Sequence, residues 1–297
     1  MKTGRHKATV GFIGIGKMGL PMASRIAAHG YPLKVYDISA AAIMEFCNRF
    51  ADARAAKTLK EIGRSCKVVI LMLPDSDVVK RVLFGEKDTL VPHLSRGSIV
   101  IDMSSSNPAV TREIGPRLEE SGVDFIDAPV SGGVKRAVDG SLAIMVGGDS
   151  TVIARVQPLL STMGHSIIET GMLGSGHAMK ALNNYVSAAG LLVACEALKI
   201  GVDFGIPPDK IIAVLNASTG KNNSTENKMM QFVVPKQFNS GFSLGLMRKD
   251  ITIATDLSKR LGSKTLLGEI LLKSWTDAET KLGGAADHTE IFRMLDG

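Results

Sequence analysis

In the first part of the chain, short apolar runs alternate with segments of helical periodicity. The runs expected to form strands cover residues 8–15, 32–37, 67–74, 97–104, 123–130, 142–148 and 165–170. Continuous apolar strands that alternate with helices are typical of a mostly parallel sheet covered by helices on both faces. The pattern therefore predicts a doubly wound α/β domain.

The pattern changes after about residue 172, where strand-like runs stop and helical periodicity continues to the end. Residues 180–205 read as one helix of more than 20 residues, and further helices are expected at 208–219, 246–262 and 266–283. We predict two domains, an α/β domain over 1–172 and an all-α domain over 173–297, joined by the long helix.

Composition narrows the function classes. Hydrophobic residues make up 45% and charged residues 22% of the 297 residues, as in an ordinary soluble globular protein. The net charge of +6 favours small anionic ligands, but the basic residues are scattered and aromatic residues are only 5%. Since a nucleic-acid binder gathers its basic residues on one face, we expect no nucleic-acid partner.

Three well-separated cysteines, Cys47, Cys66 and Cys195, argue against a disulfide framework and fit a reducing compartment. We expect them to be small core residues rather than nucleophiles. The longest apolar run, 185–195, ends at Glu196 and is shorter than the roughly 20 residues of a membrane span. The polar start of the sequence also lacks the apolar region of a signal peptide, so we expect a cytoplasmic protein with no membrane partner.

Gly14, Gly16 and Gly19 have the GxGxxG spacing of a dinucleotide-binding turn, after an apolar run and before a helical pattern. In such a turn the first glycine makes the bend, the second lets backbone approach a pyrophosphate and the third lets helix and strand pack closely. Lys17 and Met18 would present backbone at the start of the helix, where anions bind. A tight glycine turn without a ligand is the alternative.

Asp37 lies 18 residues after Gly19, at the end of the second predicted strand. A carboxylate there accepts hydrogen bonds from the adenosine ribose and repels a 2′-phosphate, and neither Ile38 nor Ser39 offers a guanidinium to hold one. NAD is therefore the expected cofactor, in preference to NADP. A helix cap is the alternative role for Asp37, and the two roles are compatible.

Two further strand ends place Leu73, Pro74 and Ser105 at the carboxyl edge of the predicted sheet, where ligands bind in such folds. Helix capping by the serines at 104–106 is the alternative.

A third strand leads into DAPVSGG, in which Ser131, Gly132 and Gly133 offer a hydroxyl and exposed N–H groups to a carboxylate. An ordinary loop is the alternative.

A polar stripe interrupts the most apolar predicted helix. Lys180, Asn183, Asn184 and Ser187 fall at i, i+3, i+4 and i+7, on one face. The stripe either faces solvent or borders the buried segment that follows. In the second case Lys180 would be partly desolvated, which lowers the pKa of a lysine toward the range useful for proton transfer.

Lys249 and Asp250 form a second charged pair, which we expect at the opening of a helix. A lysine there is electrostatically unfavourable without an anionic partner, so a ligand is one interpretation and a solvated pair is the other. The six histidines show no metal-ligand spacing, and no metal site is expected. His177 is the one closest to the proposed site.

Taken together, four motifs resemble the β-hydroxyacid dehydrogenase family, which includes 3-hydroxyisobutyrate dehydrogenases. The motifs cover residues 11–26, 127–148, 174–184 and 248–254. The resemblance implies a Rossmann-type coenzyme domain, a helical second domain, and transfer of a hydride between a short 3-hydroxyacid and NAD. It also implies a homodimer or homotetramer.

By this resemblance Lys180 is the general acid/base and Asn184 orients the substrate. Ser131, Gly132 and Gly133 would bind the substrate carboxylate. Other residues would contact the coenzyme, and they are Gly14, Gly16, Lys17, Met18, Gly19, Asp37, Leu73, Pro74, Ser105 and Lys249, the last also reaching the substrate.

The sequence departs from the family pattern at Ser105, where threonine is commoner, and at Arg136, where many members have glycine. Asn222, Asn223 and Ser224, in the polar segment 217–228, suggest a polar substrate side chain, or simply a solvated loop. Two other functions compete, an imine reductase and a non-catalytic dinucleotide-binding scaffold. Imine reductases usually replace the catalytic lysine, and a scaffold has no need for Lys180 with Asn184.

Overall fold

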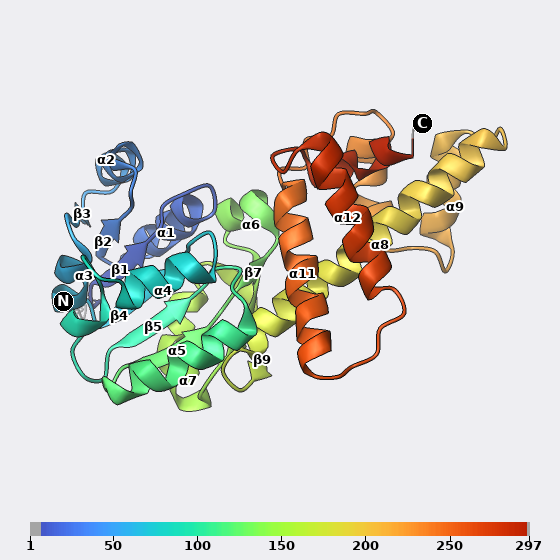
Figure 1. Cartoon of the computed structure of the whole chain (residues 1–297). Coiled ribbons are helices and arrows are strands. Elements are labelled where there is room, and N and C mark those ends of the chain that lie inside the picture. Colours follow the sequence, from blue (N-terminus) through green and yellow to red (C-terminus); the bar gives the residue numbers. More distant parts are fainter. Residues whose placement is uncertain (1–6, 296–297) are drawn as a thin grey trace. The chain divides into compact units, whose positions relative to one another are not determined.

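A computed structural model describes residues 7–295 of the chain (Figure 1). The chain forms two compact units, and the division falls between Lys180 and Ala181. The first unit is built around a sheet and the second is helical, as the periodicity predicts.

The first unit contains a sheet of nine strands among its described residues, in the order β3-β2-β1-β4-β5-β6-β8-β7, with β9 paired to β8. The strands are β1 Val10–Ile13, β2 Leu33–Tyr36, β3 Ala53–Ala55, β4 Val68–Leu71, β5 Ile99–Asp102, β6 Asp124–Asp127, β7 Val130–Ser131, β8 Leu142–Gly147 and β9 Gly164–Gly171. Pairing from β3 to β6 is parallel throughout, while β8 runs antiparallel to β6 and β7. The order of the first six strands is that of a Rossmann fold, so the expected class is confirmed.

Helices cover both faces of this sheet. They are α1 Gly19–Ala28, α2 Ala40–Arg49, α3 Leu59–Ser65, α4 Ser76–Phe84, α5 Pro108–Glu120, α6 Gly133–Asp139 and α7 Ser150–Leu160, with a short 3₁₀ turn, η1 Val91–His93. One core joins the sheet to α1, α2, α6 and α7, and a second joins it to α3, α4 and α5. Within β5, Ile99 and Ile101 belong to the first core and Val100 to the second, because successive strand side chains point to opposite faces.

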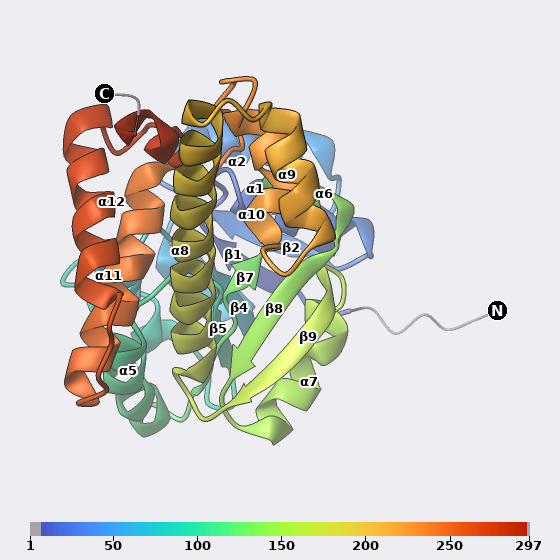
Figure 2. The same cartoon turned by 90° about the vertical axis from the view of Figure 1, so that its right-hand side faces the viewer.

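The second unit packs helices around Trp275, which is fully buried. Its elements are α8 Ser175–Asp203, which starts in the first unit, then α9 Pro208–Ala217, α10 Asn223–Asn227, the π-helical η2 Met229–Val233, α11 Leu244–Arg260, α12 Gly268–Leu282 and η3 His288–Met294. Figure 2 shows α8 as one long uninterrupted helix. The predicted helices are thus present.

α8 has two unlike sides. Ala188, Leu191 and Leu198 are buried in the core of the second unit, whereas Val186 and Val193 are largely exposed. By length and composition α8 passes as a membrane span, because its most apolar 18-residue window has a mean hydropathy of 1.5, and 28% of that window is buried. The core helix of a soluble protein meets the same criteria, and here one side of α8 has that role.

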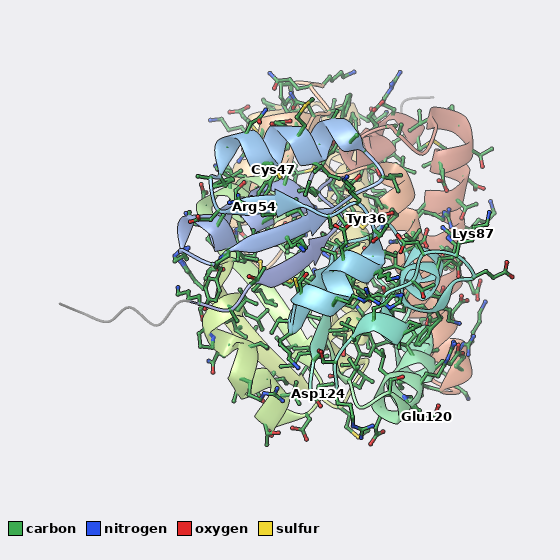
Figure 3. All side chains as sticks on the ribbon, turned by 90° about the vertical axis from the view of Figure 1, so that its left-hand side faces the viewer. Tyr36, Cys47, Arg54, Lys87, Glu120 and Asp124 are labelled. Atoms are coloured by element: carbon green, nitrogen blue, oxygen red, sulfur yellow. The ribbon has the colours of Figure 1, made fainter. Side chains whose placement is uncertain are left out.

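The cysteines lie apart from one another and are all free thiols. Cys47 lies on α2, at the sheet edge where β3 carries Arg54 (Figure 3). Burial raises the pKa of all three thiols, that of Cys195 to about 12. A thiol that holds its proton is a poor nucleophile, which agrees with the expected role as small core residues.

Candidate active site

The glycine turn after β1 is shaped by contacts that exclude a side chain. A Cβ on Gly14, whose φ is +96°, would lie 2.2 Å from the Met72 carbonyl oxygen, and one on Gly19 would lie 1.9 Å from the Gly14 carbonyl oxygen. A Cβ on Gly16 would meet nothing within 4 Å. Gly14 and Gly19 therefore serve the packing of strand against helix, while Gly16 leaves open space for a ligand.

The beginning of α1 has the features of an anion site. Met18 occupies its N-cap position and makes no side-chain capping bond, whereas α2, α3, α4, α5 and α7 are each capped by a side chain. Gly16 and Lys17 before it are exposed. Uncapped N–H groups and the positive end of the helix dipole fit a pyrophosphate. The residues present thus fit the coenzyme that the motif predicts.

Asp37 is tied to this turn. Its carboxylate accepts hydrogen bonds from the backbone N–H of Ile15 at 2.7 Å and of Ser39 at 2.8 Å. Ser39, not Asp37, caps α2. The carboxylate is therefore held beside the glycine turn, as a ribose contact requires, and Ile38, the next residue, is exposed.

Residues 104–106, here called the serine loop, follow β5 and bind the backbone at the end of β4. The Leu73 N–H donates to the Ser104 hydroxyl at 2.9 Å, and the Ser106 hydroxyl donates to Asp102 at 2.8 Å. Asn107, rather than a serine, caps α5. The alternative of helix capping by these serines is therefore wrong, and Ser105 lies half-buried in a loop that spans two neighbouring strand ends.

The loop predicted to bind the substrate carboxylate, residues 131–133, connects β7 to α6. Gly132 and Gly133 are exposed and have φ of 132° and 67°, conformations that favour glycine. The aliphatic stem of Arg136 lies against Gly132, because an added Cβ there would be 2.5 Å from its Cδ. Arg136, the departure from the family pattern, therefore contacts the loop that carries Ser131.

Lys180 lies in the second turn of α8 and is half-buried. The glycines before it allow the helix to start against the sheet. Gly174 has φ of +88°, and a Cβ on Gly176 would lie 2.3 Å from the Met145 carbonyl oxygen. His177, in the first turn of α8, is buried, so its ring packs inside the first unit.

One turn further along α8, Asn184 is buried and makes one hydrogen bond through each of its amide atoms. Its Nδ2 donates to the Asp250 carboxylate at 2.5 Å, and its Oδ1 accepts from Asn183 at 3.0 Å. Asp250 is also buried and belongs to α11. The interpretation that this stripe faces solvent is therefore wrong for Asn184, although Asn183 is exposed.

Lys249 is not at the opening of a helix. α11 begins at Leu244 with Ser243 as its cap, so Lys249 lies in the second turn. The helix was expected to begin at residue 246, but it begins two residues earlier because Ser243 caps it. The argument from an unfavourable helix start therefore fails, and Lys249 remains a candidate through its position beside Asp250.

The polar segment 217–228 contains one candidate that sequence reasoning missed. Asn222 caps α10 in a capping box, and Ser224 is buried, so neither serves as an open loop residue. The Lys228 ammonium donates to the Ser187 hydroxyl of α8 at 3.2 Å. Burial lowers the pKa of Lys228 to about 8, against the opposing effect of Asp287. Only the fold brings together residues 41 positions apart.

Comparisons with known proteins agree with this arrangement. Residues 9–174 match the model of the NAD-binding domain of 6-phosphogluconate dehydrogenase, and residues 174–295 match that of the NAD-binding domain of NADP-dependent 3-hydroxyisobutyrate dehydrogenase. The chain belongs to the β-hydroxyacid dehydrogenase family. The resemblance drawn from four motifs is confirmed.

Relatives within the β-hydroxyacid dehydrogenases span nearly the whole chain. The human mitochondrial 3-hydroxyisobutyrate dehydrogenase is 34% identical, covering 97% of this chain and 87% of its own. The NAD-dependent L-serine dehydrogenase of Pseudomonas aeruginosa is 32% identical, covering 89% of each. The solved structure of Mycobacterium tuberculosis 3-hydroxyisobutyrate dehydrogenase with L-serine superposes with a TM-score of 0.90 at 28% identity, covering 98% of this chain and 100% of that one.

Proposed function

We propose that this protein oxidises the hydroxyl of a short 3-hydroxyacid with NAD, using Lys180 as the general acid/base. The observation that carries the proposal is the position of a half-buried lysine close to the start of α8, a helix that begins against β8 and the end of β6. These strands belong to the same sheet as the strands that precede the dinucleotide turn and the serine loop. Bound NAD supplies the hydride acceptor.

Lys180 holds and moves the proton in this proposal. A neutral amine accepts the proton of the substrate hydroxyl during oxidation, and the ammonium returns it during reduction. Ser131, Gly132 and Gly133 bind the carboxylate through a hydroxyl and backbone N–H groups. Asn184, oriented by Asp250, presents its amide to the substrate.

Replacing Lys180 with methionine tests this role. Lys180→Met should lower kcat by at least about 100-fold, within the usual range for loss of general acid/base catalysis. Coenzyme binding, measured by NADH fluorescence, should persist because the glycine turn is untouched. The matched control is Lys199→Met on the same helix, whose ammonium pairs with Asp203. Turnover by Lys180→Met at the control's rate would refute the proposal.

The substrate is proposed by class. Relatives named for 3-hydroxyisobutyrate and for L-serine both support a three-carbon hydroxyacid core with a small substituent. A panel of short hydroxyacids, including 3-hydroxyisobutyrate, L-serine, glycerate, threonate and 4-hydroxybutyrate, assayed with NAD and NADP, identifies substrate and coenzyme together. Turnover of cyclic imines but of no hydroxyacid would favour the imine reductase instead.

We also propose that the protein forms a homodimer or homotetramer, and that it works in a reducing compartment such as the cytoplasm. The exposed apolar side of α8 supports self-association, since soluble monomers rarely leave large contiguous apolar surface in water. Three free thiols support a reducing compartment.

A further inference from the structure

The start of α8 is held by a side chain from another element. Asp127, the last residue of β6, accepts hydrogen bonds from the backbone N–H of Gly174 and of His177, both at 2.7 Å. A carboxylate at this position satisfies N–H groups that the helix cannot pair itself and complements its dipole. The place at which α8 begins is thereby fixed to the end of β6.

The His177 ring lies between two buried carboxylates. Its Nδ1 is 3.6 Å from Asp127 Oδ2 and its Nε2 is 3.7 Å from Asp102 Oδ2. Nδ1 also hydrogen-bonds the Thr111 hydroxyl of α5 at 2.8 Å. All four side chains are buried, and within residues 7–295 Nε2 has no hydrogen-bond partner, so the ring is oriented by Thr111 and by the field of two acids.

Asp102 also organises a loop of the candidate site, and Asp127 lies just before another. Asp102 accepts hydrogen bonds from Ser104 and Ser106 and so shapes the serine loop, which in turn binds the Leu73 N–H. Asp127 precedes the loop that carries Ser131 by only a few residues. His177 therefore lies in one buried network with Asp102, which shapes the serine loop, and with Asp127, which holds the start of α8.

We propose that His177 is a positioning residue that, with Asp102 and Asp127, sets the placement of Lys180 for proton transfer. Lys180 follows His177 by three residues on the same face of α8, so a shift of the ring moves the amine. A displacement of about 1 Å can cost on the order of 100-fold in rate. This inference rests on the proposed role of Lys180.

The test compares His177→Leu with His177→Gln. Leucine fills the space without polar atoms, and glutamine restores groups that can reach Thr111 and the acids. We expect kcat to fall at least about 10-fold in His177→Leu and to recover to within about 3-fold of wild type in His177→Gln. NADH should still bind at one site per chain, because the glycine turn lies outside the network.

Val156→Ala is the matched control, a buried truncation on α7 that destabilises the same unit without touching the network. It separates a loss of stability from a loss of position, since unfolded enzyme would lower kcat and the NADH stoichiometry together. If leucine proves too disruptive to purify, Thr111→Val, which removes one hydrogen bond at nearly constant volume, should lower kcat about 3-fold with unchanged NADH stoichiometry.

Two results would overturn the inference. One is a His177→Leu enzyme with wild-type kcat, and the other is a fall in kcat matched by an equal fall in NADH stoichiometry. Either result leaves the proposed function standing as long as Lys180→Met is inactive. Conversely, an active Lys180→Met enzyme would refute the proposed function whatever His177 does.

Discussion

Gly16 and Gly19 are three residues apart, yet an added methyl group would meet different surroundings. At Gly19 it would collide with the backbone of Gly14, and at Gly16 it would enter open space. We expect Gly19→Ala to lower the free energy of unfolding by about 1–3 kcal/mol, as overpacking does. Gly16→Ala should keep wild-type stability but weaken NADH binding about 10-fold by blocking close approach of the pyrophosphate.

Urea unfolding and NADH fluorescence titration measure the two quantities separately. Wild-type NADH affinity in Gly16→Ala would show that the open space at this turn is not a coenzyme site.

Asp37 provides a second prediction at this scale. Asp37→Asn removes the charge that repels a 2′-phosphate and weakens a ribose contact, so the ratio of kcat/KM for NADP to that for NAD should rise about 10-fold. Steady-state kinetics with both coenzymes measure the ratio. Asp52→Asn, an exposed acid in the turn before β3, should leave it unchanged. A wild-type preference for NADP would contradict the assigned role of Asp37.

Individual residues differ in how far their surroundings could be read from the sequence. Asp37 and the glycines were identified because the spacing from the glycine turn through α1 to the end of β2 is regular. Lys228 was missed because its partner, Ser187, is on another helix. Asn222 was one of three residues that suggested either a polar substrate side chain or a solvated loop, and only the structure shows that its side chain caps α10.

At the scale of elements, Asp287 holds the start of η3 against the segment before α11. This carboxylate caps η3 and accepts hydrogen bonds from Ser240, Gly241 and Thr289. Burial alone would raise the pKa of Asp287, but hydrogen bonds from His288, Thr289 and Ser240 outweigh it and hold the pKa well below its ordinary value. A carboxyl with a depressed folded-state pKa stabilises the fold above its unfolded pKa, and this contribution is lost as the pH falls.

Asp287→Asn should therefore lower the free energy of unfolding at pH 7 by about 2 kcal/mol, the scale of hydrogen bonds to a charged group. The difference from wild type should narrow as the pH falls below about 4, because the Asp287 carboxyl of the unfolded chain then takes up a proton while the folded chain keeps it ionised. Urea unfolding at several pH values measures both effects. The control is Asp277→Asn, which removes an exposed i,i+4 pair with Lys273. A difference independent of pH would contradict the assignment.

Helix boundaries were predictable where capping residues mark them. α5 starts after Asn107 with Pro108 at its first position, and both of these sequence signals act within the helix itself. The three-residue β3 and the two-residue β7 were not predicted, since such short strands show no periodicity and exist through pairing with their neighbours.

At the scale of the whole molecule, the exposed side of α8 predicts how copies of the chain associate. Val186, Val193 and Ile200 repeat every seven residues and are each at least 60% exposed. We expect light scattering of the wild-type protein to give a mass at least twice the 31.5 kDa of one chain. The double variant Val186→Asp/Val193→Asp should give the mass of a single chain. Val214→Asp, at an exposed valine of α9, is the control.

A wild-type monomer at micromolar concentration would contradict this prediction. Flotation of the wild-type protein with liposomes would instead assign the apolar side of α8 to a membrane surface.

The sequence by itself determined the fold class, the dinucleotide turn and the family, because these depend on periodicity and on spacings within single strand–turn–helix units. Only the tertiary structure decided what surrounds the candidate catalytic helix. The ring of His177 meets acids that lie 75 and 50 positions earlier in the chain (177 − 102 and 177 − 127). Contacts of that range leave no local pattern, since they arise when strand ends and helix starts converge at one edge of a sheet.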